Sequence, residues 1–411
     1  MIYIFLFISL FIVFYQYKRE GKPVNLLSLL IVPYIVIVII NNLIIYKFGF
    51  YKINDEVLIL LSCVFIIIFL GTIPFKFSID NHTDQNNINI LKSYNIKAIK
   101  RFLYIVSFLG LSKALILYKQ GILFNADNDF EGIMGTGPIA HMLLASYSVL
   151  PIYFLNWTYN RKLKEIIPVI LILLVAFSTM IKYNTIGPII SLFIFVCIYR
   201  KNILKKAILS FAIIILLIFI ANYAIGFALL GIKVETTFYL VHFWKYFAGS
   251  LINDNYIFSS GINVGIGIFD KLLIFLFALP NMFINKITGT TFYSYEMLPW
   301  EAQSVSNLGE VSNVIDVFGF LYPSKGDFGE IIWFAIIIFI VSILFSYIYI
   351  KATSIRNSFS PFIAIMLTYF VALDFYSPFF VLAGPWEILI WSLIIPSLFK
   401  VRKKSKTLIF K

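Results

Sequence analysis

Long apolar runs separated by short polar segments dominate the chain. A helix that crosses a bilayer needs about 20 mostly apolar residues, with about 17 as the lower limit. Runs of this kind predict about eleven transmembrane helices, at 1–17, 24–46, 57–75, 102–118, 137–157, 166–181, 185–199, 207–230, 331–350, 360–376 and 383–399. The pattern therefore predicts an all-α fold, a polytopic integral membrane protein with a single membrane domain over 1–411.

One long segment, 231–330, breaks this pattern and is predicted to form a large loop on the outer side of the membrane. It holds two semi-apolar stretches, 236–257 and 264–285, and the first is rich in Phe, Tyr and Trp. If both crossed the membrane, the FSSGIN link between them would be an inner loop without Lys or Arg. Interfacial or partly re-entrant helices are therefore the preferred interpretation.

Composition excludes a water-soluble protein. The chain is 61% hydrophobic and only 13% charged, whereas soluble domains carry about 25% charged residues. Its net charge of +13 does not indicate nucleic-acid binding, because the basic residues lie in short clusters between apolar runs. The first run lacks a positive leader and a small-residue cleavage site, so it is interpreted as a transmembrane helix rather than a signal peptide.

The distribution of charge predicts the orientation. With the N-terminus outside, the inner segments carry 23 Lys or Arg and 4 acidic residues, while the outer segments carry 9 and 14. Basic residues concentrate on the cytoplasmic side of membrane proteins. The tail 400–411 is therefore expected in the cytoplasm, and all six arginines fall on that same side.

Three charged residues, Lys113, Asp374 and Glu387, lie within predicted spans, each in the outer half. A charge inside a span is a functional-site hypothesis by default. The alternative is a lysine that extends its amine to the headgroups, with carboxylates that reach the same layer.

The segment FYLVHFWKYFAGSLINDN places His242 and Lys245 three residues apart. In a helix this spacing puts both side chains on one face. A cation beside a titratable imidazole can hold a phosphate or relay a proton. The alternative is an interfacial helix whose aromatic side chains lie in the headgroup layer.

The segment 312–334, SNVIDVFGFLYPSKGDFGEIIWF, is called the 312–334 motif below. Its polar residues are Asn313, Asp316, Tyr322, Lys325, Asp327 and Glu330, set among glycines and aromatic residues. Aromatic rings beside carboxylates and amides form a common sugar-binding surface. An ordinary loop with an aromatic anchor is the alternative. The sequence has no Walker loop, HExxH, GxSxG or paired CxxC, so no metal or cofactor is expected.

The order N-x-x-x-x-F-G-x-x-Y…D-F-G ahead of a late span resembles the O-antigen or oligosaccharide repeat unit polymerases (Wzy type). Many spans, one large outer loop in the second half and a basic tail are also similar to that family. The resemblance covers the whole chain in architecture and about 20 residues in motif. It implies a bacterial polysaccharide biosynthesis enzyme of the cytoplasmic (inner) membrane.

The resemblance further implies a glycosyltransferase whose donor is an undecaprenyl-pyrophosphate-linked oligosaccharide. The lipid carrier of that donor lies in the membrane, so membrane lipid is also an expected partner. It would transfer the growing glycan from the lipid pyrophosphate to a new lipid-linked repeat unit, and its partners would include a chain-length regulator and a flippase. The candidate bases are His242 and Asp327, and the candidate sugar-binding residues are Tyr322, Asn313 and Asp374. The candidate phosphate-binding residues are Lys182, Lys245 and Lys113.

One departure concerns the pyrophosphate, because polymerases of this family often hold it with an outer arginine and here every arginine is expected inside. Lys182, in the tight outer hairpin STMIKYNTIGP, is the proposed replacement. Three alternative functions remain open: a flippase or transporter, an O-antigen ligase in which His242 is more central, and a lipid-phosphate-sugar transferase that uses Asp55 and Glu56.

Overall fold

The computed structural model describes residues 1–75, 88, 91–121, 130–179, 181–200, 214, 217, 220–221, 224, 233, 235–260, 267–290, 303–323, 327–354 and 361–401. The chain is all-α, and a single pair of two-residue strands is present in the described part. By contacts it divides into two compact units. The first unit holds 1–80, 219–354 and 366–387, and the second holds the remaining residues.

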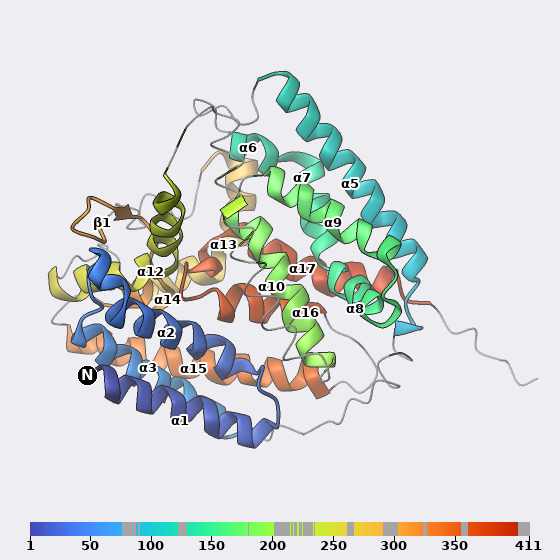
Figure 1. The fold of residues 1–411 in the computed structure, drawn as a ribbon. Helices are drawn as coiled ribbons and strands as arrows, with labels where there is room; N and C mark the ends of the chain where they lie inside the picture. The colour runs from blue at the N-terminus through green and yellow to red at the C-terminus, as the bar shows by residue number, and fades with distance from the viewer. Residues whose placement is uncertain are drawn as a thin grey trace, which may run out of the picture. The chain divides into compact units, whose positions relative to one another are not determined.

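Four long helices of the first unit lie side by side (Figure 1): α1 (Ile2–Glu20), α2 (Leu26–Leu43), α3 (Asp55–Thr72) and α15 (Phe328–Ser354). Their ends are set by local chemistry. α1 stops at Gly21, which adopts a left-handed conformation. Asn25 and Ser28 form a capping box at the start of α2. The Arg19 guanidinium bonds the carbonyls of Thr72 and Ile73, which end α3.

The rest of the first unit contains the connections that carry the 312–334 motif. Its elements are η1 (Ile45–Phe48), α12 (Thr236–Ser260), α13 (Ile268–Thr288), β1 (Gln303–Ser304), β2 (Val311–Ser312), α14 (Val317–Leu321), the π-helical turn η4 (Thr368–Ala372) and η5 (Phe379–Val381). β1 and β2 pair antiparallel, with Gln303 opposite Ser312. α12 packs against α2, α3, both strands and α14.

The second unit is built from α5 (Ile96–Lys119), α6 (Phe130–Gly135), α7 (Gly137–Tyr147), α8 (Leu150–Asn160), α9 (Leu163–Ser178) and α10 (Lys182–Tyr199). α5 packs along α7, α8 and α9, and α10 packs against α8 and α9. Two further helices, α16 (Pro361–Leu367) and α17 (Ala383–Leu398), each have residues in both units.

Among the described residues, five helices are long and apolar enough to cross a membrane: α1, α2, α3, α5 and α15. The number rises to seven if two bent pairs each count as one span, namely α7 with α8, bent by 48°, and the two halves of α13. These helices indicate a membrane-embedded protein.

The predicted count of eleven spans is not confirmed. α9 has 16 residues, and α10, α16 and α17 contribute only shorter apolar helices. Most of the predicted span 207–230 lies outside the described residues. The two stretches 236–257 and 264–285 correspond to α12 and α13, and their place at the membrane surface stays a prediction.

Candidate functional site

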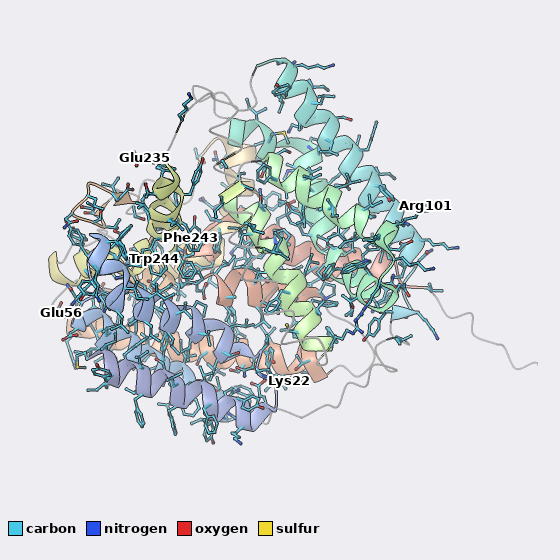
Figure 2. The ribbon with its side chains drawn as sticks, viewed as in Figure 1. Lys22, Glu56, Arg101, Glu235, Phe243 and Trp244 are labelled. Carbon is cyan, nitrogen blue, oxygen red and sulfur yellow. The ribbon has the colours of Figure 1, made fainter. Side chains whose placement is uncertain are left out.

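Polar side chains on α12 attach this helix to three other parts of the first unit. Asn253 Nδ2 donates to the carbonyls of Ser312 and Val314, at 3.0 and 2.6 Å. Trp244, labelled in Figure 2, donates from Nε1 to Asn41 Oδ1 on α2 at 2.9 Å. Asn255 Nδ2 bonds the Lys52 carbonyl at 2.7 Å. The helix that carries His242 and Lys245 is therefore held directly against the start of the 312–334 motif.

Within that motif, Asp316 is the N-cap residue of α14. Its Oδ1 accepts the backbone N–H of Gly319 at 2.6 Å, and its Oδ2 accepts the Tyr34 hydroxyl at 2.8 Å. Asp254, from α12, shares a hydrogen bond with Asp316. Both aspartates are buried, with 1% and 0% exposure for Asp254 and Asp316. Since two carboxylates can share a hydrogen bond only through a proton, the pair holds one.

Burial is the main cause of the unusual titration of this pair. It raises the pKa of Asp316 to about 6, against the opposing effect of the bonds from Gly319 and Tyr34. It also raises the pKa of Asp254, and the neighbouring Asp316 charge adds to that rise. The Asp254–Asp316 pair can therefore gain or lose a proton when the pH or the solvent exposure of the two carboxyls changes.

Gly319 is required at its position because α12 approaches it closely. A Cβ on Gly319 would overlap Asp254 Oδ1 and would lie 3.1 Å from Asp316 Oδ1. The glycine that follows Phe318 in the motif thus has a steric explanation, since only glycine leaves room for the two carboxylates.

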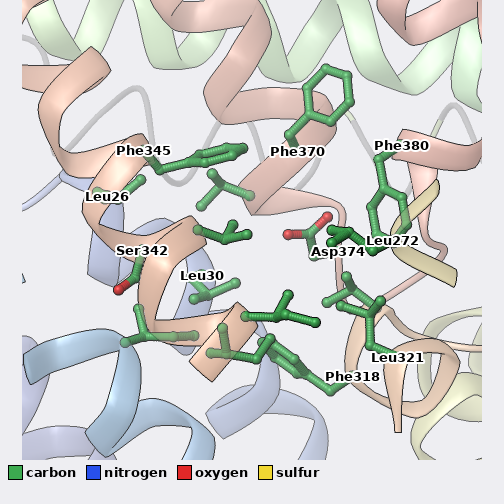
Figure 3. A pocket seen from close by; sticks show the side chains of 16 residues that line it. Leu26, Leu30, Leu272, Phe318, Leu321, Ser342, Phe345, Phe370, Asp374 and Phe380 are labelled. Carbon is green, nitrogen blue, oxygen red and sulfur yellow. The ribbon is translucent and has the colours of Figure 1, made fainter. Parts of the chain in front are cut away.

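Asp374 follows the π-helical turn η4 and is also buried. Its carbonyl accepts the backbone N–H of Val317 at 3.1 Å, which ties it to α14. Its side chain points into a cavity between α2, α3, α14 and α15 (Figure 3). That Asp374 contacts a sugar stays a prediction, and the apolar walls of this cavity offer few partners for sugar hydroxyls.

Lys271 supplies a buried cation on α13. It is 1% exposed, and its Nζ donates to the Tyr322 carbonyl at 2.6 Å, where α14 ends. Glu330, at the start of α15, lies close enough to interact with its charge. This lysine holds the middle of the 312–334 motif against α13.

The two residues predicted on one face of α12 have different surroundings. The His242 ring stacks on Phe238 at 4.9 Å and meets Tyr246 edge-on at 5.0 Å. Lys245 forms an ion pair with Glu310 at 3.2 Å, and its side chain is 17% exposed. A phosphate would have to displace the Glu310 carboxylate to reach this lysine.

The three predicted residues of the motif itself are spread along it. Asn313 is exposed. The Tyr322 ring packs edge-on against Phe258 at 4.3 Å, at the end of α12. Asp327 is exposed and caps α15, since its Oδ1 accepts the Glu330 N–H at 3.1 Å. Capping explains an aspartate at this position without any chemistry.

The remaining two lysines belong to the second unit. Lys113 donates to the carbonyls of Ile133 and Thr136, at 2.6 and 2.9 Å, around the end of α6. A cation at carbonyls left free by a helix end is a stable arrangement in itself. Lys182 begins α10, and its side chain lies outside the described residues.

Sequence reasoning missed three polar residues that the fold buries, Tyr34, Asp254 and Lys271, and it named Asp316 only as one of the polar residues of the motif. A helix start at Asp316 could have been recognised, because an aspartate precedes the apolar segment VFGFL. The pairing of Asp254 with Asp316 could not have been recognised. The two residues lie on separate elements, and no repeat in the sequence links their positions.

No group of three or more His, Cys, Asp or Glu side chains that could hold a metal ion occurs in the part of the chain that the structure describes. No family model matches the chain, and no curated protein or solved structure is similar to it at a significant level.

Proposed function

We propose that the protein is a repeat unit polymerase of a bacterial surface polysaccharide. In this proposal it is a glycosyltransferase that moves a glycan from undecaprenyl pyrophosphate to a second lipid-linked repeat unit. The observation that carries the proposal is the attachment of α12 to the 312–334 motif through Asn253. The two segments whose sequences carry candidate chemistry are neighbours in one unit, next to helices apolar enough to cross a membrane.

The proposed reaction needs a cation for the departing pyrophosphate and a base for the acceptor hydroxyl. Lys245 is the candidate cation on α12, and the Glu310 carboxylate that pairs with it occupies the position an anionic phosphate would take. His242, one helical turn earlier, is the candidate base. Asp316 and Asp254 position the motif against α12 and do not contact the substrate in this proposal.

The experiment is the analysis of lipid-linked glycans in cells that lack the gene. A polymerase leaves single complete repeat units on the lipid, and plasmid-borne wild type restores the ladder of longer chains. Long chains that stay on the lipid would indicate a ligase, and incomplete units would indicate a sugar transferase. Either of these results would contradict the proposal.

A lipid-linked-oligosaccharide flippase is the second candidate, and the buried aspartates favour it. Oδ1 of Asp254 and Oδ1 of Asp374 have no hydrogen-bond partner among the described residues. Buried carboxylates in membrane proteins often serve proton-coupled transport. In the same cells a flippase defect would also leave single units, but on the cytoplasmic side. Protection of those units from an externally added glycosidase would therefore favour transport over polymerisation.

A further inference from the structure

A cavity of about 90 Å³ lies inside the first unit, between α2, α3, α14 and α15. Its walls are leucine, isoleucine, valine and phenylalanine side chains, and Asp374 and Ser342 are the polar side chains among its lining residues. Figure 3 shows the Asp374 carboxylate directed toward the middle of this space, with Phe345, Phe370 and Phe380 around it. Three of the surrounding helices, α2, α3 and α15, are long and apolar enough to cross a membrane.

The Asp374 carboxyl has an unsatisfied oxygen in this apolar space. The residue is 7% exposed, and its Oδ1 has no hydrogen-bond partner among the described residues. Ser342 does not supply one, because its hydroxyl donates to the Phe339 carbonyl at 2.7 Å. A buried polar atom without a partner costs about 1–3 kcal/mol, which a bound hydrogen-bond donor would remove.

The lining restricts the chemistry of that donor. A sugar has several hydroxyls, and most would be left without partners against these walls. A phosphate or carboxylate would bring its charge into an apolar space whose lining offers no cation to pair with it. A neutral alcohol on an apolar chain fits both conditions, because its single O–H donates to Oδ1 and its carbon chain contacts the leucine and phenylalanine side chains.

We propose that this cavity binds the hydroxyl end of a long-chain lipid alcohol, whose first carbons occupy the space around Asp374 while the chain continues between the helices. The site goes beyond the proposed polymerase activity and does not depend on it. The ligand of this cavity has one hydrogen-bond donor, no charge and an apolar chain.

The test uses the full-length protein in phosphatidylcholine nanodiscs and a photoreactive 1-decanol with a diazirine in its chain. Labelled peptides are mapped by mass spectrometry. Label is expected on α15 around 337–345 and on 370–380, and unlabelled 1-decanol is expected to displace it. The methyl ether of decanol, which has the same chain without a donor, should compete about tenfold less well, as expected for one buried hydrogen bond. Decanoate should also compete poorly. This comparison needs only the wild-type protein.

A matched pair of variants on α15 tests the location. Val341 lines the cavity, whereas Ile340 beside it is 56% exposed. Val341→Phe should fill the space and remove the label from 370–380, while Ile340→Phe should leave it unchanged. Equal competition by decanol and its methyl ether, or equal labelling of the two variants, would overturn the proposal. Neither result would bear on the glycan ladder, so failure here is distinct from failure of the proposed polymerase.

Discussion

The Tyr34 hydroxyl donates a 2.8 Å hydrogen bond to Asp316, 282 residues further along the chain. The bond joins α2, a candidate span, to the N-cap of α14 in the 312–334 motif. Asp254 reaches the same carboxylate from α12. Three distant segments thus meet at one protonated carboxyl pair, and the protonation of this pair should affect the stability of the whole first unit.

Stability should therefore fall as pH rises through the range in which this pair loses its proton. Burial raises the pKa of Asp316 from 3.8 to about 6. At pH values between these two, the folded state therefore binds more protons than the unfolded state. The stabilising contribution of the protonated Asp316 is complete below pH 3.8 and is lost as pH rises through about 6, on the order of 3 kcal/mol. The midpoint of thermal unfolding in detergent, measured from pH 4 to 7.5, checks this.

The matched variant is Asp316→Asn, which keeps an N-cap oxygen but cannot ionise. Its unfolding midpoint should depend less on pH than that of the wild type over the same range. The difference between the two curves removes the contributions of other acids, such as Glu165, whose pKa is lowered by its bonds to Lys100 and Tyr153. Two parallel curves would contradict the assignment.

Gly319→Ala should destabilise the protein by about 1–3 kcal/mol, because its Cβ would overlap the buried Asp254 carboxylate. The control is Gly329→Ala in the same motif, where the new Cβ would meet only the exposed Asp327 carboxylate at 3.3 Å. Membrane abundance and unfolding temperature should drop for the first variant and stay near wild type for the second. A Gly319→Ala protein as stable as wild type would show that α12 does not press on this glycine.

Asp327 can be explained by helix capping or by a role in the proposed transfer, and its replacement by asparagine distinguishes the two. Asparagine caps a helix as well as aspartate does, so Asp327→Asn should leave stability unchanged, while Asp327→Ala should cost about 1 kcal/mol. If the carboxylate also takes part in the proposed transfer, Asp327→Asn should shorten or abolish the glycan ladder at normal protein level. A full-length ladder from Asp327→Asn would leave capping of α15 as its role.

The sequence predicted the helical class and the positions of α1, α2, α3, α5 and α15 well, because continuous apolar runs longer than a bilayer is thick carry a strong signal. It was less successful at α7 and α8, where one predicted span is two helices bent by 48°. Pro151, near the start of α8, cannot donate the bond that would continue a straight helix.

Sequence reasoning did less well with polar groups. It selected exposed or surface-paired residues such as Asn313, Asp327 and Lys245, since polar side chains near apolar runs are conspicuous in a sequence. It passed over Tyr34, whose hydroxyl is hidden in an apolar stretch, and Asp254, which sits in a polar stretch that resembles a solvated one. Burial of those groups depends on tertiary contacts across hundreds of residues, which no local pattern records.

The predicted orientation is tested by cysteine accessibility. After Cys63 and Cys197 are replaced by serine, Leu308→Cys is a suitable outer probe, because Leu308 is 63% exposed, and Lys351→Cys is its inner counterpart. The charge distribution predicts that an impermeant maleimide labels position 308 in intact cells and position 351 only after permeabilisation. The reverse pattern would place the 312–334 motif in the cytoplasm, where the proposed donor is not presented.

Polymer formation by the purified protein tests the proposed function most directly. Single lipid-linked repeat units, extracted from cells that lack the gene, are mixed in detergent with wild-type protein or with His242→Ala, and no nucleotide sugar is added. We expect a ladder of longer lipid-linked glycans with the wild type, because the lipid pyrophosphate itself activates the transferred sugar, and none with the variant, which lacks the candidate base. Units that stay single with a correctly folded wild-type protein would contradict it.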